Sequence, residues 1–330
     1  MMTAKHMLTT VGTRLRRVFG KRRGTQGLRA AVAISETEIA VALVRRLEGQ
    51  RPKVLRIMVE PAPLGFADPV LKKIISEFDL RRIPLSAVIG ASDYQIAQVP
   101  TPEVPRAEFR AAARYSMRDA FDFPIDNATL DVFDLPAEAN SGAKGTCFAI
   151  ATRGDAIEKM TRSIERQFRS FDVIDIPELC QRNLAALLPQ DAKGVAFLMI
   201  RDEFAQLVLT RNGMLYVTRR FDFGMRGELN GDEGVEANEL PLDPQMLSLE
   251  LQRSLDYYES HFDESAIADL FIAPAGIRAN LMAAELSVST GLRIQMFNIF
   301  DLVDVSYQAE IPDGWLPCMA IGAALRARAG

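Results

Sequence analysis

Residues 28–61 read LRAAVAISETEIAVALVRRLEGQRPKVLRIMVEP, and they decide the fold because their pattern returns at residues 195–222 as VAFLMIRDEFAQLVLTRNGMLYVTRRFD. In each copy a short apolar run meets a polar turn, and a second apolar run leads through a glycine-containing turn to a third. These later turns contain Glu48-Gly49 and Asn212-Gly213, pairs typical of β-hairpins. The pattern predicts two copies of a three-stranded meander, and therefore two lobes with a cleft between them.

The composition is that of an ordinary globular protein. The chain has 330 residues, 48% of them apolar and 25% charged, which suits two lobes of about 150 residues each. No apolar stretch approaches the roughly 20 residues that span a bilayer, and no secretory signal is recognisable. The three cysteines Cys147, Cys180 and Cys318 are far apart and odd in number, which argues against disulfides or a metal knuckle. We expect a cytoplasmic protein.

The residue inventory argues against histidine-based catalysis. Only two histidines exist, His6 in a terminal segment and His261 at the end of a periodic helix, so a histidine-based triad or metal site is hard to build. The clustered acids are the pairs Asp131/Asp134 and Asp172/Asp175. They could serve a phosphotransferase, but their position at strand ends is more typical of capping.

Charge is divided between a basic tail and an acidic body. Residues 1–27 carry seven Lys or Arg and no acid. Subtracting these charges from the whole-chain formal charge of −4 leaves −11 for residues 28–330. An acidic body repels phosphate backbones, and no aromatic-basic motif is present, so nucleic acid is excluded as a partner.

The tail has a helical apolar spacing and predicts a basic amphipathic helix suited to an anionic membrane surface. The residues expected to contact the membrane surface are Arg14, Arg16, Arg17, Phe19, Lys21, Arg22 and Arg23. A disordered solubilising tail and an organellar transit peptide remain alternatives.

The chain divides into three parts. Residues 1–27 form the tail, 28–191 the first lobe, and 192–330 the second lobe. A change of texture at about 93–170 predicts a small α+β subdomain inserted in the first lobe. The second lobe contains an acidic loop at about 224–242, without the spacing of a metal site, and should end in a helix from Pro317 to Arg328.

Three further segments carry a resemblance to a known family. They are VPTPEVPRAEFRAAARYSMRDAFDFPIDNATLDVFDLP (99–136), LSLELQRSLDYYESHF (247–262) and CMAIGAALRA (318–327). With the duplicated meander, they resemble the actin-like ATPase superfamily, and most closely the PilM and MshI proteins of type IV and mannose-sensitive-haemagglutinin (MSHA) pilus assembly. The resemblance implies an α/β fold: a duplicated actin-like, ribonuclease H-like architecture with a subdomain inserted in the first lobe.

The phosphate-binding positions implied by this resemblance are degenerate. Family members that use ATP carry an aspartate and a glycine in each meander's first turn, where amides approach phosphates and a carboxylate orients metal-bound water. Here those positions hold Ala33, Ser35 and Ala40 in the first copy, Met199 and Arg201 in the second, and only Gly276 of a glycine pair in APAG. A shift of two would recruit Asp202, but without a glycine. We expect a pseudo-ATPase with no cofactor and no metal, although Arg201 could attract an anion.

The resemblance also implies a partner. It is the short cytoplasmic tail of a bitopic inner-membrane pilus protein, PilN-like or MshJ-like, docked on the first lobe near the insertion. YQIAQVP (94–100) and the helix beginning at Pro105 are the candidate walls of the docking groove. The expected location is the inner face of the inner membrane. Two alternatives remain: an active ATPase or phosphotransferase with unusual phosphate loops, and an FtsA-like polymerising tether.

Overall fold

A computed structural model describes residues 26–62, 67–105, 108–116, 120–136, 145–168, 171–201, 204–222, 244–274, 277–306, 309–312 and 314–326. The predicted membrane-binding tail, the whole acidic loop at about 224–242, Asp202 and Gly276 lie outside these ranges. Among the helices of the described residues, none combines the length and the apolar character needed to cross a bilayer.

The first lobe is built on a six-stranded sheet with the order β14-β3-β2-β1-β4-β8. The first meander forms as the sequence predicts, since β1 and β3 both pair antiparallel with β2, while β4 and β8 add in parallel. Its strands are β1 (Leu28–Ile34), β2 (Glu38–Arg45), β3 (Lys53–Pro61), β4 (Leu85–Val88), β8 (Phe171–Asp175) and β14 (Asp304–Val305).

The second lobe repeats this plan. Its five-stranded sheet has the order β11-β10-β9-β12-β13, which matches β3-β2-β1-β4-β8 strand for strand. The strands are β9 (Val195–Ile200), β10 (Phe204–Arg211), β11 (Met214–Asp222), β12 (Asp269–Ala273) and β13 (Arg293–Met296). The predicted duplication is therefore confirmed.

The insertion is a three-stranded antiparallel sheet in the order β5-β7-β6. It comprises β5 (Tyr94–Pro100), β6 (Ala128–Asp134), β7 (Thr146–Arg153) and the helix α3 (Phe109–Ser116). The next helix is α4 (Gly154–Glu165), which the sequence predicts to belong to the insertion at about 93–170. Its residue Ile164, and Phe168 just after it, pack in the first lobe's core beside α2 (Ala67–Phe78). The end of this helix therefore packs with the first lobe.

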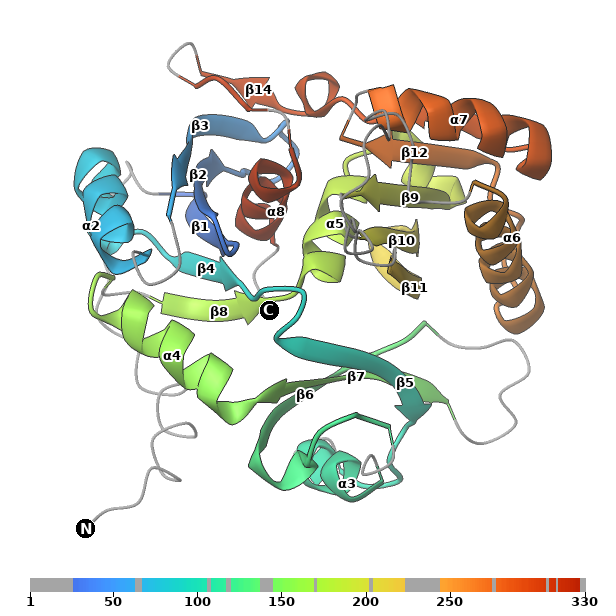
Figure 1. The fold of residues 1–330 in the computed structure, drawn as a ribbon, viewed down its shortest axis with the longest axis horizontal. Coiled ribbons are helices and arrows are strands. Elements are labelled where there is room, and N and C mark those ends of the chain that lie inside the picture. Colours follow the sequence, from blue (N-terminus) through green and yellow to red (C-terminus); the bar gives the residue numbers. More distant parts are fainter. Residues whose placement is uncertain are drawn as a thin grey trace, which may run out of the picture.

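Two helices lie between the large sheets. Figure 1 shows α5 (Pro177–Ala185) against the second sheet and α8 (Trp315–Ala324) against the first, with α2 outside one sheet and α6 (Pro244–His261) and α7 (Ile277–Thr290) outside the other. The prediction that the terminal helix completes the second lobe is wrong, because α8 packs on β1, β2 and β4. The short strand β14 also crosses over and pairs with β3. Each lobe thus donates a helix toward the other.

Small side chains explain why α8 crosses. Alternate residues of β1 and β2 on the face toward α8 are alanines, Ala31, Ala33, Ala40 and Ala42, all buried in the core shared by the lobes. The opposite face carries larger residues such as Val32 and Ile39, which pack with α2 and α4. A flat alanine surface lets a helix approach closely, and α8 is apolar on every side, as a helix buried between two layers should be.

The helices α5 and α8 touch at Gly322. A Cβ atom there would overlap the carbonyl oxygen of Cys180 and lie 2.9 Å from its carbonyl carbon. Asn183 donates from Nδ2 to the Gly322 carbonyl at 2.9 Å. Only glycine permits this approach.

Replacing Gly322 with alanine should therefore destabilise the protein. In an unobstructed helix this change gains up to about 1 kcal/mol, but overlap with a packed backbone costs about 1–3 kcal/mol or more. We expect a net loss of about 2 kcal/mol in the free energy of unfolding, measured in urea. Gly145→Ala is the matched control, since its Cβ would meet no atom closer than 3.8 Å. Equal stability of the two variants would contradict the crossing geometry.

Candidate functional site

The turn between β1 and β2 is held by hydrogen bonds between its own residues. The Ser35 side chain accepts from the backbone N–H of Glu38 at 3.0 Å and of Thr37 at 3.4 Å. The Ser35 backbone N–H donates to the Glu38 carbonyl at 2.9 Å. A phosphate-binding turn presents free amides to its ligand, whereas here Ser35 occupies two of them.

The other first-copy positions belong to the core. Ala33 and Ala40 face each other as cross-strand partners and are 1% and 0% exposed. Both lie in the alanine surface on which α8 packs. A carboxylate or ammonium at either position would have to be buried against α8, at a large desolvation cost.

The second copy replaces phosphate contacts with aromatic ones. Met199 is completely buried and pairs in register with Gln206. The Arg201 guanidinium lies 5.2 Å from the ring centroid of Phe204 and 5.6 Å from that of Trp315, the first residue of α8. Arg201 thus helps to join the second lobe's turn to the helix that enters the first lobe.

Two of the clustered acids have arginine partners. Asp131 pairs with Arg110 of α3 at 2.9 Å, and Asp175 is engaged by Arg326. Within the described residues, no group of three or more His, Cys, Asp or Glu side chains could hold a metal ion. His261 is exposed and stacks on Tyr257.

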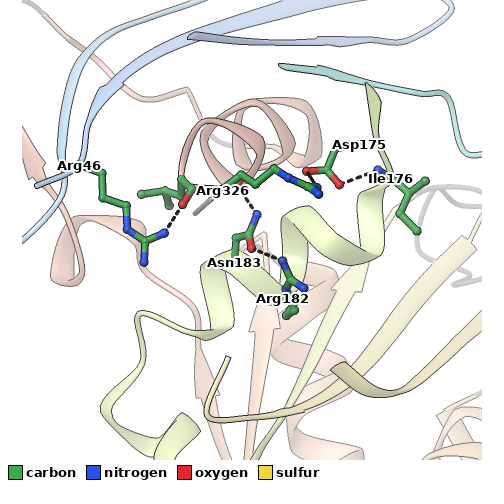
Figure 2. A network of polar contacts seen from close by, with 8 residues as sticks. Arg46, Asp175, Ile176, Arg182, Asn183 and Arg326 are labelled. Atoms are coloured by element: carbon green, nitrogen blue, oxygen red, sulfur yellow. Dashed lines mark hydrogen bonds and ion pairs between the residues drawn. The ribbon is translucent and has the colours of Figure 1, made fainter. Parts of the chain in front are cut away.

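Asp175 anchors the end of α8. Its side chain is fully buried at the end of β8, and Oδ2 lies 2.9 Å from Nη1 of Arg326, just after α8. Its Oδ1 accepts from the Ile176 N–H at 3.2 Å. Figure 2 shows Arg326 directed at Asp175, while Arg46 reaches from the first lobe to the Leu325 carbonyl. Asp175 therefore links the end of β8 to the residue that follows α8.

Glu178 joins three parts of the molecule. It lies on α5, is 3% exposed, and accepts a short hydrogen bond from the Tyr94 hydroxyl of β5. Gln206 of β10 also hydrogen-bonds to it. Burial raises the pKa of the Glu178 carboxyl and, with Glu178 beside it, raises the pKa of Tyr94 well above its usual range. The insertion, the crossing helix and the second lobe therefore meet at one buried acid.

Two more contacts connect the second lobe to the insertion and to the segment that leads into it. The Tyr257 hydroxyl of α6 donates to Oε1 of Gln98 on β5 at 3.1 Å. Arg220 of β11 donates to the Ala91 carbonyl, just before β5, at 2.9 Å. The strand β5 therefore contacts the second lobe along one face.

The two predicted walls of the docking groove lie at opposite edges of the insertion's sheet. The strand β5 forms one edge of the three-stranded sheet, and α3 packs beside β6 at the other edge. Arg114 of α3 donates to the Ala128 carbonyl at 2.8 Å. Of the two walls, β5 is the one that borders the junction with the second lobe.

Sequence reasoning missed the residues that organise the junction, namely Tyr94, Glu178, Gly322 and Arg326. Glu178 has only a weak signal in the sequence, because it is simply an acid that follows the first proline of a helix. Gly322 has a clearer one, a glycine among alanines in a fully apolar helix. Neither signal names its partner.

Comparisons with known proteins agree with the topology. No protein-family model and no curated protein matches the sequence. A solved structure of a PilM-PilN type IV pilus biogenesis complex aligns over 92% of this chain and 98% of that chain, with a TM-score of 0.67 and 17% identity.

Two further structures align with TM-scores below 0.5. One is a Bacteroides thetaiotaomicron protein with an actin-like ATPase fold, at 8% identity, covering 87% of this chain and 96% of its own, with a TM-score of 0.48. The other is the cytoplasmic domain of EpsL from Vibrio cholerae, at 11% identity, covering 91% and 96%, with a TM-score of 0.47. The duplicated sheet order and the extensive PilM alignment establish that the chain has the two-lobed actin-like fold.

The buried acid gives a pH prediction. Because the pKa of Glu178 is raised in the folded state, its protonated form contributes stability below the unfolded pKa of about 4.3, and this contribution is lost as pH rises through the folded pKa. Glu178→Gln keeps an acceptor for Tyr94 and does not titrate. We expect urea unfolding to show this variant gaining stability relative to the original protein as pH rises above the unfolded pKa of about 4.3.

The exposed substitution Glu259→Gln on α6 is the control and should follow the original protein. Parallel stability curves for Glu178→Gln and the original protein would show that the pKa of Glu178 is not raised by folding.

Proposed function

We propose that this protein is a cytoplasmic scaffold in the inner-membrane assembly platform of a type IV pilus, of the MSHA type, and that it works without ATP hydrolysis. The observation that carries the proposal is the alignment with PilM in its complex with PilN, which extends over nearly the whole of both chains. The proposed assembly role is an analogy drawn from this shared architecture, since one fold can host different functions.

The phosphate turns support a role without nucleotide. The residues present do not fit Mg·ATP, because Ala33 and Ala40 lie beneath α8 and Ser35 occupies turn amides. Arg201 contacts two aromatic rings, and a guanidinium cannot coordinate Mg²⁺. The actin-like fold then serves as a rigid support. Among the described residues of these turns, the active-ATPase alternative finds no carboxylate at the expected phosphate positions to hold the metal, and Asp202 lies outside them.

The proposed partner is the cytoplasmic tail of a PilN-like or MshJ-like membrane protein. An extended tail can add to the edge of a sheet through backbone hydrogen bonds, and β5 is an edge strand of the insertion. Because Tyr94 and Gln98 of β5 contact α5 and α6, a tail bound there would lie beside the junction of the lobes.

The basic tail of this chain is the proposed second contact with the membrane. Its seven cations would each contribute about 1 kcal/mol near an anionic surface. Together with the partner, it would keep the protein at the inner face of the inner membrane.

Hydrogen exchange tests the docking site. A synthetic peptide copying the cytoplasmic tail of a PilN-like protein from the same genome should slow exchange of the amides at 94–100 in β5. The amides at 128–134 in β6, the opposite edge, are the internal control and should not change. Mg·ATP should leave exchange at residues 35–38 unaltered. Protection of β6 alone, or protection of the 35–38 turn by Mg·ATP, would contradict the proposal.

Co-sedimentation tests the tail. We expect the full chain to bind vesicles containing phosphatidylglycerol and not vesicles of phosphatidylcholine. Deleting residues 1–25 should abolish this binding, because the remaining body is strongly acidic. A truncated protein that binds as well as the full chain would show that the tail is not a membrane anchor, while the peptide experiment would still test the scaffold role.

A further inference from the structure

Arg182 is the exception in a buried helix. Every other residue of α5 from Pro177 to Ala185 is buried, and Arg182 alone reaches partway to solvent. Its Nη2 donates to the Asn183 side-chain oxygen at 2.9 Å, which is a neutral acceptor. A guanidinium has five N–H donors and normally meets a carboxylate when it is largely buried.

A long arginine often buries its stem and keeps its head in water. Arg182 departs in part from this pattern, because burial lowers the pKa of its guanidinium, so the charged head has lost some of its water. The charged neighbours that act on it are Asp175 and Arg326. Of these, Asp175 is already paired with Arg326 at 2.9 Å.

Within the described residues, three arginines therefore gather around the end of α8 with one carboxylate among them. Arg326 follows the helix, Arg182 comes from α5, and Arg46, just after β2, donates to the Leu325 carbonyl (Figure 2). The carbonyl end of a helix supplies about half a negative charge, and Asp175 supplies one. In this part of the chain the positive charge therefore exceeds the negative charge by more than one.

The three arginine side chains are accessible from solvent to different degrees. The side chain of Arg326 is 29% exposed, Arg46 is exposed, and Arg182 is half-buried. Arg46 adjoins the end of the first sheet where β1 begins, since Leu28 pairs with Arg45. The Ser35 turn lies at the other end of β1.

We propose that Arg182 and Arg326, with Arg46 at the rim, form a binding site for an oxyanion, either a peptide carboxylate or a phosphate. Planar guanidinium groups bind both through paired N–H donors. The bound oxyanion would give the Arg182 guanidinium a charged acceptor. It would also link α5, which belongs to the first lobe in the sequence, to the end of α8. The site is independent of the pilus role and of any nucleotide.

Isothermal titration of the full chain tests the site. The probes are inorganic phosphate and the peptide acetyl-Gly-Glu-Gly-amide, each against sodium chloride at equal ionic strength. We expect at least one probe to bind with a stoichiometry of about one, and Arg182→Gln to weaken binding on the order of tenfold or more, as expected when a hydrogen bond to a charged group is lost. The probe that binds identifies the source of the oxyanion.

Arg253→Gln is the matched control, because Arg253 is an exposed arginine on α6 paired with Glu250. It should bind the probe like the original protein. If Arg182→Gln does not fold, the Nε–Hε resonances of the original protein replace it as the readout, and those of Arg182 and Arg326 should shift with probe while that of Arg253 does not. Neither probe binding, or equal binding by Arg182→Gln, would overturn the proposal.

Discussion

The close approach of α5 and α8 at Gly322 is the constraint on which the rest of the structure depends. With no side chain at Gly322, the α8 backbone rests against the Cys180 carbonyl, and Asn183 hydrogen-bonds across the contact. Each helix packs on the sheet of one lobe, so this contact joins the two sheets into a single apolar core. The ion pair of Asp175 with Arg326 and the contacts of Glu178 with Tyr94 and Gln206 surround the crossing with buried polar links.

The same packing accounts for the state of the candidate site. An actin-like fold that uses ATP needs a carboxylate and open amides where the strands of each lobe end. Here the corresponding alanines of β1 and β2 are the surface that receives α8, and Arg201 contacts the first residue of that helix. Side chains that elsewhere could serve a ligand therefore serve cohesion between the lobes. This is the physical basis for our proposal that the protein acts by binding partners.

Much of the fold could be predicted from the sequence because its signals are local. The short apolar runs LRAAVAI and VAFLMI, together with Gly49 and Gly213 in positive-φ turns, predict the two meanders. The placement of α8 could not be predicted this way, since an apolar helix shows that it is buried but not which sheet buries it. The residues of the junction were missed for the same reason. Tyr94 and Glu178 are 84 positions apart, and only the folded chain brings them together.

We propose that the crossing helices hold the two lobes in one arrangement that nucleotide does not alter. Spin labels at Lys72→Cys on α2 and Val288→Cys on α7, both exposed positions on opposite lobes, report the separation of the lobes by double electron–electron resonance, and the three native cysteines are buried. We expect one narrow distance distribution that is the same with and without Mg·ATP. A distribution that shifts when Mg·ATP is added would contradict it.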